Sequence, residues 1–203
     1  VLGETLITGI GQGYIQTTPL QLCMMTAQIA NGGFAVKPKI IVDSNPISYE
    51  DAKQSMESGL LFDTDSEELL DKKLFKNQRN IKIVQEAMFA STNERFGTSY
   101  KSRIDDPKYQ FAGKTGTAQV KRISKREREL DLELEQIPYK DRDHALYVAY
   151  GPYVNPRYAL SIIVEHGGSG SKAAAPIAKK LFKLIIDRHD LRNKQSNFER
   201  ITV

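Results

Sequence analysis

The chain has 203 residues, enough for one domain with a core of its own, and its 40% hydrophobic and 27% charged residues are typical of globular proteins. It contains no apolar run of about 18 residues, which excludes a membrane-spanning helix within this sequence. The single cysteine, Cys23, excludes an internal disulfide. The three histidines lie too far apart in the sequence for a metal-ligand motif, so we expect no metal and no cofactor.

The first predicted helix begins at Thr18-Pro19, because Thr18 can cap its N-terminus, proline suits a first turn and Gln21 completes a capping box. Its packed face is predicted to hold Leu22, Met25 and Ile29. The Asn-Gly-Gly sequence at residues 31–33 is typical of a helix end, and residues 34–42 are predicted to be extended.

Residues 43–80 differ in character from the rest of the chain and are predicted to form a peripheral insertion. Residues 43–78 include nine acidic residues and four lysines, with few large apolar residues, and no function can be read from them. A helix is then predicted from about Asn80 to Phe96, followed by a loop at residues 98–108. The packed face of this helix is predicted to hold Ile83, Ala87 and Ala90.

The segment 111–120 contains Lys-Thr-Gly-Thr and favours extended backbone. Because residues two apart share a face of a strand, Thr115 and Thr117 present two hydroxyls side by side, a pair that can hold a carboxylate. Gly116 lets a ligand backbone approach closely, and Lys114 adds a positive charge. If this strand is a sheet edge, its free N–H and C=O groups can pair with an extended peptide, and one N–H can stabilise an oxyanion.

Two other interpretations of this segment are possible. One is an ordinary strand that happens to carry a lysine and two threonines. The other is a phosphate-binding loop, because Gly113-Lys114-Thr115 ends like one. That motif requires a glycine five positions before Gly113, where this chain has Lys108, so the phosphate loop is strongly disfavoured.

Residues 121–143 are predicted to be a second insertion, a solvated and charged helix. The basic run at 121–126 raises the question of nucleic-acid binding, but the whole segment holds seven Lys or Arg and seven Asp or Glu. A phosphate-binding surface is not normally diluted with acidic residues in this way. We therefore predict no nucleic-acid partner.

Two apolar strands are predicted at residues 145–151 and 158–165. Both are apolar on both faces, so both are predicted to be central in the sheet and covered by helices on both sides. A final amphipathic helix is predicted from about Lys172. Its packed face is predicted to hold Ile177, Leu181, Leu184 and Ile185. The polar tail at 189–203 is expected to fray, which leaves 1–188 as the predicted domain.

A series of ordered motifs along the chain resembles the C-terminal part of class B penicillin-binding proteins, and among them the penicillin-binding protein 2 subgroup of rod-shape transpeptidases. The resemblance covers roughly residues 3–42 and 81–188. The segments that carry it are Leu6–Tyr14 with its Gly-Gln-Gly, Thr17–Leu22, Ala30–Gly33, Lys114–Val120, Asp143–Ala145 and Glu165–Gly170.

The resemblance implies an incomplete penicillin-binding-protein or β-lactamase-like transpeptidase fold, of the α/β (α+β) class, with an antiparallel central sheet flanked by helices. It implies a serine-type D,D-transpeptidase that cross-links peptidoglycan in cell-wall and cell-shape maintenance and is a target of β-lactams. It further implies residence at the bacterial inner membrane with the domain on the periplasmic side, and an anchor that is not in this chain.

Roles for four residues follow from the same resemblance. Lys114 is implied as an electrostatic partner that supports proton transfer and attracts the terminal carboxylate of the substrate. Thr115 and Thr117 are implied to bind that carboxylate along a strand whose Gly116 admits the substrate, and the Thr117 N–H to complete the oxyanion hole. The implied partners are the D-Ala-D-Ala stem peptide, β-lactams, the rest of its own polypeptide, a membrane glycan polymerase and elongation-complex proteins.

The nucleophile of the family is expected to be absent from this chain. Ser169–Lys172 reads literally as Ser-x-x-Lys but follows Lys114, whereas the nucleophile of the family lies well before the Lys-Thr-Gly strand. Ser91–Asn93 reads as Ser-x-Asn but lies within a predicted helix, close to Lys114. Both are interpreted as chance matches, and the chain is expected to be an inactive fragment of the enzyme.

Two alternatives remain open at this point. A related D,D-carboxypeptidase or β-lactamase is not excluded by Lys-Thr-Gly alone, although the Gly-Gln-Gly and His-Gly-Gly segments favour the transpeptidase. A non-catalytic fragment or one piece of a split gene is favoured by the missing nucleophile. His166 is interpreted as a structural histidine and not as a catalytic one.

Overall fold

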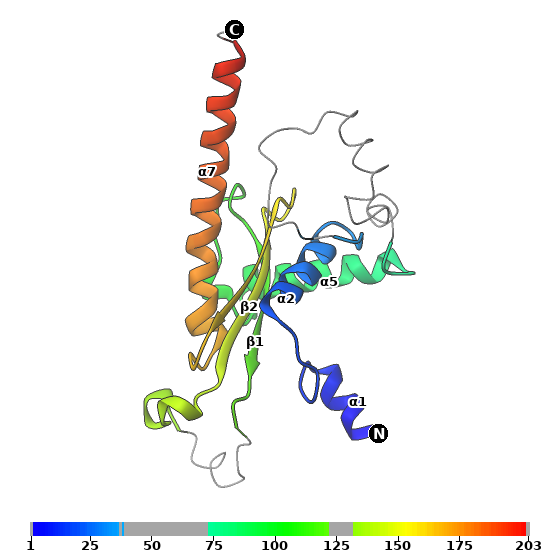
Figure 1. Ribbon diagram of the computed structural model, residues 1–203, viewed down its shortest axis with the longest axis vertical. Helices are drawn as coiled ribbons and strands as arrows, with labels where there is room; N and C mark the ends of the chain where they lie inside the picture. The colour runs from blue at the N-terminus through cyan, green and yellow to red at the C-terminus, as the bar shows by residue number, and fades with distance from the viewer. Residues whose placement is uncertain (1, 37, 39–72, 122–131, 202–203) are drawn as a thin grey trace, which may run out of the picture.

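The computed structural model describes residues 2–36, 38, 73–121 and 132–201. Most of the predicted insertion at 43–80, and residues 122–131 of the second insertion, lie outside these described residues. In the described part, an antiparallel sheet of three strands lies between helices on both faces (Figure 1). This confirms the mixed α/β class and the helix-flanked antiparallel sheet.

The sheet has the order β1-β2-β3, with β1 at Ala112–Ala118, β2 at His144–Gly151 and β3 at Tyr158–Val164. Within the described residues β2 is central, as predicted, but β3 pairs only with β2 and forms an edge. For the strands that the structure describes, the prediction of a central β3 was therefore wrong. Because helices cover both faces of this small sheet, a strand can be apolar on both faces and still lie at its edge.

One face of the sheet packs against the C-terminal helix α7, which spans Ala175–Ile201. The ring of Phe111 stacks on Phe182 with centroids 4.8 Å apart, and Tyr147 meets Phe111 edge-on at 6.5 Å. This first core cluster is completed by Ile104, Ala145, Ala149, Ala174, Ala175, Ala178 and Ile186. The small alanines of the helix allow it to lie close to the strands.

The opposite face packs against α2 (Pro19–Ala30) and α5 (Gln78–Asn93). Here Met88 packs with Ala112 and Tyr150. The partly buried side chains around them are Ile29, Ala30, Phe89, Val148, Tyr153 and Ala159. The two helices thus close the face of the sheet that α7 leaves open.

The ends of α2 confirm the sequence prediction. Thr18 Oγ1 accepts from the Gln21 N–H at 3.2 Å, and Gln21 Oε1 accepts from the Thr18 N–H at 2.8 Å, which is a complete capping box. Asn31 caps the C-terminus and its N–H donates to the Ala27 carbonyl at 3.0 Å. The Asn-Gly-Gly signal therefore ends the helix where it was expected to.

The packed face of α5 was predicted wrongly. The helix begins at Gln78, with Asn77 as its cap, and it buries Ile81, Met88 and Thr92. Ile83, which was predicted to be packed, is 53% exposed. The buried face includes a polar residue, Thr92, whose hydroxyl finds buried partners, and a search for apolar periodicity passes over such a residue.

The register of α7 was also predicted wrongly. A π-helical turn at Gly170–Ala174, with Ala174 buried, leads into the helix, whose buried side chains include Ala175, Ala178, Phe182 and Ile186. Leu184, assigned to the packed face, is 61% exposed. The helix also continues to Ile201 and extends past the sheet (Figure 1), through the tail that was expected to fray.

The remaining elements are short. Helix α1 (Leu2–Gly9) projects away from the sheet (Figure 1), and a turn that includes Gly11 and Gly13, both with positive φ, follows it. Three 3-10 turns lie at Tyr100–Ser102, Leu134–Gln136 and Tyr139–Asp141. Among the described helices, none combines the length and apolar character needed to cross a membrane.

Candidate active site

Strand β1 carries the Lys-Thr-Gly-Thr sequence from the core to the surface. Ala112 and Gly113 are buried, whereas Lys114 and Thr117 are exposed. Within the described residues β1 pairs only with β2, so it is a sheet edge, which was the condition set by the sequence argument.

The carbonyl groups on the open side of β1 accept hydrogen bonds from side chains. Asn93 Nδ2 donates to the Phe111 carbonyl at 2.9 Å, and Thr92 Oγ1 to the Gly113 carbonyl at 3.4 Å. Further along, Lys114 Nζ donates to the Thr115 carbonyl at 2.8 Å and Gln12 Nε2 to the Thr117 carbonyl at 3.1 Å. These four carbonyls, at residues 111, 113, 115 and 117, form what we call the outward carbonyl row.

Every second carbonyl of the strand belongs to the outward carbonyl row, and this pattern also shows which way the N–H groups point. In an antiparallel ladder the N–H and C=O of one residue point to the same side of the strand. The N–H groups of Thr115 and Thr117 therefore point away from β2, toward the open side. An extended ligand beside β1 would meet both the N–H and the C=O of these two residues.

The side chains of the motif divide between the two faces of the sheet. Thr115 and Thr117 lie opposite Tyr147 and Ala145 and share one face, as predicted, whereas Lys114 starts from the other face. The lysine stem then folds back, so that Nζ lies 3.5 Å from Thr115 Oγ1. Thr115 Oγ1 in turn lies 3.2 Å from Thr98 Oγ1. The ammonium group and the Thr115 hydroxyl thus meet at one place on the strand.

Sequence reasoning did not single out Gln12 as a contact of the strand. It lies in the Gly-Gln-Gly turn after α1, 105 positions before its partner Thr117. The only signal in the sequence is one polar side chain between two glycines. The contact brings the N-terminal turn to the exposed end of β1.

The glycine-rich segment before α7 also reaches this strand. A Cβ added to Gly170 would overlap the Leu146 carbonyl oxygen and would lie 2.8 Å from the Gly116 carbonyl oxygen. Gly170 is therefore in close backbone contact with β1 and β2 at the level of Gly116. Only a residue without a side chain fits this approach.

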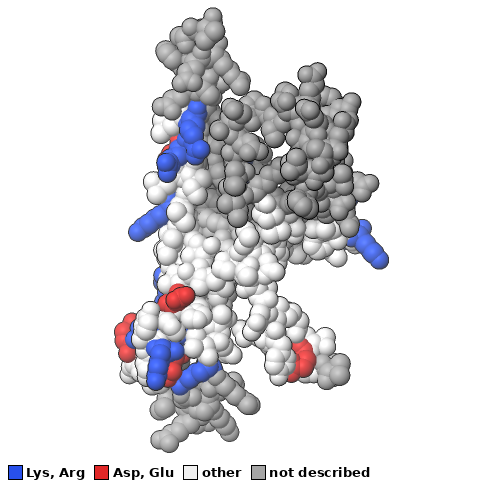
Figure 2. Space-filling view, viewed as in Figure 1, with Lys and Arg blue, Asp and Glu red and all other residues white. Residues whose placement is uncertain are grey.

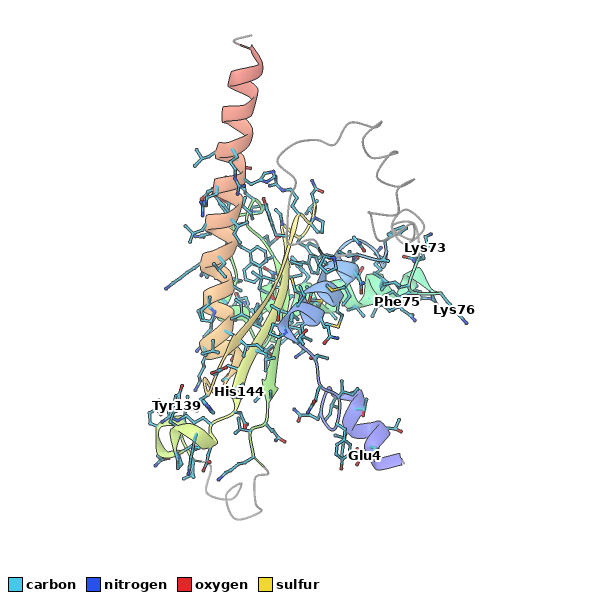
Figure 3. All side chains as sticks on the ribbon, in the orientation of Figure 1. Glu4, Lys73, Phe75, Lys76, Tyr139 and His144 are labelled. Carbon is cyan, nitrogen blue, oxygen red and sulfur yellow. The ribbon has the colours of Figure 1, made fainter. Side chains whose placement is uncertain are left out.

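A histidine cluster holds the end of the sheet beyond β1. His144 Nδ1 accepts from the His166 N–H at 2.9 Å, and His166 Nδ1 lies 2.9 Å from the Arg142 carbonyl, so this nitrogen carries the proton. Tyr139 packs on the His166 ring at 4.7 Å, and Figure 3 shows Tyr139 and His144 at this end of the molecule. His166 has a φ of 55°, which these contacts stabilise. These contacts are consistent with the interpretation of His166 as a structural histidine.

The two literal serine motifs make other contacts. Ser169 Oγ lies 2.9 Å from Ser171 Oγ, and Lys172 is exposed. Ser91 Oγ lies 3.3 Å from Thr98 Oγ1, and Asn93 is engaged with the Phe111 carbonyl. In the contacts of the described residues, the hydroxyl of neither serine lies beside the side-chain amine of a lysine.

The charged residues of the described chain are mixed in sign where the second insertion enters the sheet. Around Leu134–Asp141, at the lower left of Figure 2, blue and red side chains lie together. One ion pair there joins Lys121 Nζ and Asp141 Oδ2 at 3.2 Å. Among the described residues no group of His, Cys, Asp and Glu has the arrangement of a metal site.

Comparison with known proteins gives consistent matches. A family model described as the penicillin binding protein transpeptidase domain matches residues 1–183. The peptidoglycan D,D-transpeptidase MrdA of Salmonella typhimurium is 31% identical over 185 residues, which cover 91% of this chain and 27% of that protein. MrdA of Haemophilus influenzae is 31% identical over 193 residues, covering 93% of this chain and 26% of that protein. The chain thus spans about a quarter of the length of the curated relatives it matches.

Solved structures give the same result. PBP2 of Pseudomonas aeruginosa, solved in complex with WCK 5153, matches with a TM-score of 0.64 and 34% identity, covering 90% of this chain and 33% of that one. PBP2 of Helicobacter pylori, solved in complex with MreC, matches with a TM-score of 0.62 and 32% identity, covering 91% of this chain and 28% of that one.

Proposed function

Since this chain belongs to the penicillin-binding protein transpeptidase family, and within it to the PBP2 or MrdA type of class B, we propose that the protein carrying it is a D,D-transpeptidase that cross-links peptidoglycan. The observation that carries this proposal is the open side of β1, where Lys114 Nζ and the Thr115 hydroxyl meet on an edge strand with outward-pointing N–H and C=O groups. Such an edge suits an acyl-peptide substrate, which binds as an added strand.

The reaction that we propose is acyl transfer through a serine ester. A serine outside these 203 residues attacks the carbonyl between the two D-alanines of a stem peptide, and the terminal D-alanine leaves with a proton. A lysine three positions after that serine, also outside these residues, assists as base. The amine of a second stem peptide then attacks the ester, takes the acyl group and releases the serine.

The residues of β1 are proposed to bind and polarise the substrate. Lys114 attracts the terminal carboxylate and supports proton transfer, and the hydroxyls of Thr115 and Thr117 bind that carboxylate. The direction of the Thr117 N–H, away from β2, supports its role in the oxyanion hole, because an amide stabilises the developing charge only when it points at it. Gly116 leaves room for the substrate backbone.

The setting of the enzyme is proposed from its relatives. MreC is bound to PBP2 in one of the matched structures, which supports an elongation complex as partner, together with a membrane glycan polymerase. We place the domain on the periplasmic side of the bacterial inner membrane, where peptidoglycan is assembled. β-Lactams are proposed as its inhibitors.

Covalent labelling with a fluorescent penicillin tests this function. The full-length protein should be labelled at one serine, and Lys114→Ala should slow labelling by about tenfold or more, the effect of losing a hydrogen bond to a charged group. Lys76→Ala is the matched control, because Lys76 is exposed just before α5, far from β1 in Figure 3. Equal losses in both variants would contradict the assigned role of Lys114.

Two further measurements separate the alternatives. The isolated 203-residue chain should not be labelled, and labelling at Ser91 or Ser169 would contradict the proposal by placing the nucleophile here. A long-lived adduct in the full-length protein supports the transpeptidase. Rapid catalytic hydrolysis of a chromogenic cephalosporin would instead identify a β-lactamase.

A further inference from the structure

A cluster of buried hydroxyl groups lies behind the start of the active-site strand. Tyr147 on β2, Thr92 at the end of α5 and Ser99 in the following turn are at most 1% exposed. The Tyr147 hydroxyl lies 2.9 Å from Thr92 Oγ1 and 3.1 Å from Ser99 Oγ. We call these three residues the hydroxyl cluster.

One assignment of protons satisfies every member of the hydroxyl cluster. Ser99 donates to the Ser91 carbonyl at 3.0 Å, Tyr147 donates to Thr92 at 2.9 Å, and Thr92 donates to the Gly113 carbonyl at 3.4 Å. Burial raises the pKa of the Tyr147 hydroxyl, so it keeps its proton at neutral pH. A fully satisfied buried network holds its members in one arrangement, since any shift leaves a polar group without a partner.

The hydroxyl cluster contacts the strand at Gly113, the residue before Lys114. Thr92 Oγ1 lies 3.4 Å from the Gly113 carbonyl, and a Cβ added to Gly113 would overlap the Tyr147 ring and hydroxyl. The tyrosine therefore lies directly beneath the backbone of Gly113. Gly113 is the last residue of the outward carbonyl row whose carbonyl is bound by a side chain of α5. The next two carbonyls of the row, those of Thr115 and Thr117, are exposed.

A second tyrosine on β2, Tyr150, shows that a tyrosine can be buried in this sheet without hydrogen bonds to its hydroxyl. Tyr150 is 1% exposed, like Tyr147, but it faces the opposite side of the sheet. Its hydroxyl has no hydrogen-bond partner among the residues that the structure describes. The two tyrosines therefore form a natural pair, one with a satisfied hydroxyl beside the active-site strand and one without.

We propose that the hydroxyl cluster is a positioning unit, in which Tyr147 and Thr92 fix the backbone of Gly113 and thereby the placement of Lys114, Thr115 and the Thr117 N–H for acylation. These residues do not touch the substrate and act through the strand. The inference rests on the proposed transpeptidase function, and it adds three residues that lie outside the Lys-Thr-Gly-Thr sequence.

The test compares Tyr147→Phe with Tyr150→Phe in the full-length protein. Each change removes one buried hydroxyl from β2 and leaves the ring in place. Stopped-flow kinetics with a chromogenic cephalosporin give the acylation rate constant, and titration with a radiolabelled penicillin gives the fraction of protein that reacts. We expect Tyr147→Phe to lower the rate constant by about tenfold or more, because small misplacements of reacting groups have effects of this size. Tyr150→Phe should stay within about twofold of the parent.

A second pair of variants covers the case in which Tyr147→Phe does not fold. Thr92→Ser keeps the hydroxyl and should acylate nearly as fast as the parent, whereas Thr92→Val keeps the shape and should be slow. Hydrogen exchange of residues 112–118 should be faster in Tyr147→Phe and Thr92→Val than in their controls. This readout reports the position of the strand without reference to any reaction.

Each outcome has a definite meaning. A Tyr147→Phe protein that reacts as fast as Tyr150→Phe, per reacting molecule, overturns the inference and leaves the transpeptidase function intact. A smaller reacting fraction with an unchanged rate constant would assign the hydroxyl cluster to stability alone, and it also overturns the inference. A parent protein that no β-lactam acylates would overturn the proposed function itself, while the exchange measurement would still test the position of the strand.

Discussion

The side-chain amide of Gln12 donates a hydrogen bond to the main-chain carbonyl of Thr117 at 3.1 Å, on the side of β1 where a peptide would bind. A substrate that adds to this edge as a strand needs the same carbonyl as an acceptor. We therefore expect a bound substrate to compete with Gln12 for this carbonyl.

This relationship leads to a first prediction. Gln12→Ala should tighten non-covalent binding of a stem-peptide analogue by about twofold to tenfold, since a hydrogen bond contributes roughly 0.5–1.5 kcal/mol net. Titration calorimetry on the full-length protein measures the affinity. Gln16→Ala, at an exposed position of the same segment, is the control. Weaker binding by the Gln12 variant would mean that this residue contacts the substrate itself.

The hydroxyl of Thr117 gives a second prediction. Thr117→Val keeps the shape and strand propensity of the side chain and removes one donor to the substrate carboxylate. Acylation efficiency should fall about tenfold to a hundredfold, because a hydrogen bond to a charged group contributes about 1.5–3 kcal/mol. The melting temperature should barely change, since Thr117 is exposed. Normal acylation would show that the carboxylate binds elsewhere, and Thr17→Val, also exposed, serves as the control.

The contact between Gly170 and the strands predicts a loss of stability. Gly170→Ala would drive a methyl group against the Leu146 carbonyl and should cost about 1–3 kcal/mol, the usual range for overpacking. Urea unfolding measures the change. Gly3→Ala in α1 is the matched control, because a Cβ there meets nothing within 4 Å and alanine favours helix. A stable Gly170→Ala protein would show that the loop before α7 does not lie on the sheet.

The register of α7 can be tested with two truncations. Phe182 is fully buried against Phe111, so Phe182→Ala should lower the unfolding free energy by about 3–5 kcal/mol. Leu184, at 61% exposed, should tolerate alanine within about 0.5 kcal/mol. Urea unfolding of both variants measures the two changes in unfolding free energy. The reverse ranking would restore the packed face that the sequence pattern predicted.

Local chemistry could be predicted from the sequence. The capping box of α2 depends on two residues three positions apart, Thr18 and Gln21, and the structure contains it as predicted. The strand around Lys114 was likewise recognisable from its residue types. Helix registers were harder to predict, because α7 packs its alanines and α5 packs Thr92, while a search for large apolar residues selects Leu184 and Ile83.

The surroundings of β1 could not be predicted because they come from distant parts of the chain. The side chains that occupy the outward carbonyl row belong to Gln12, Thr92, Asn93 and Lys114. Only Lys114 lies within the motif. For a polar residue in a helix or a glycine turn, nothing in the sequence indicates which distant residue it will contact. In the sequence, Tyr147 is one of several apolar residues of a predicted strand. The contacts of its hydroxyl with Thr92 and Ser99 become visible only in the structure.

The outward carbonyl row has a consequence for solubility. An unpaired strand edge can pair with the same edge of another molecule and so begin aggregation, and proteins commonly guard such edges with lysine. Here each carbonyl of the row is already occupied by a side chain of the same molecule, and two β1 edges in contact would bring two Lys114 ammonium groups together. The lysine proposed to attract the substrate would therefore also keep copies of the protein apart.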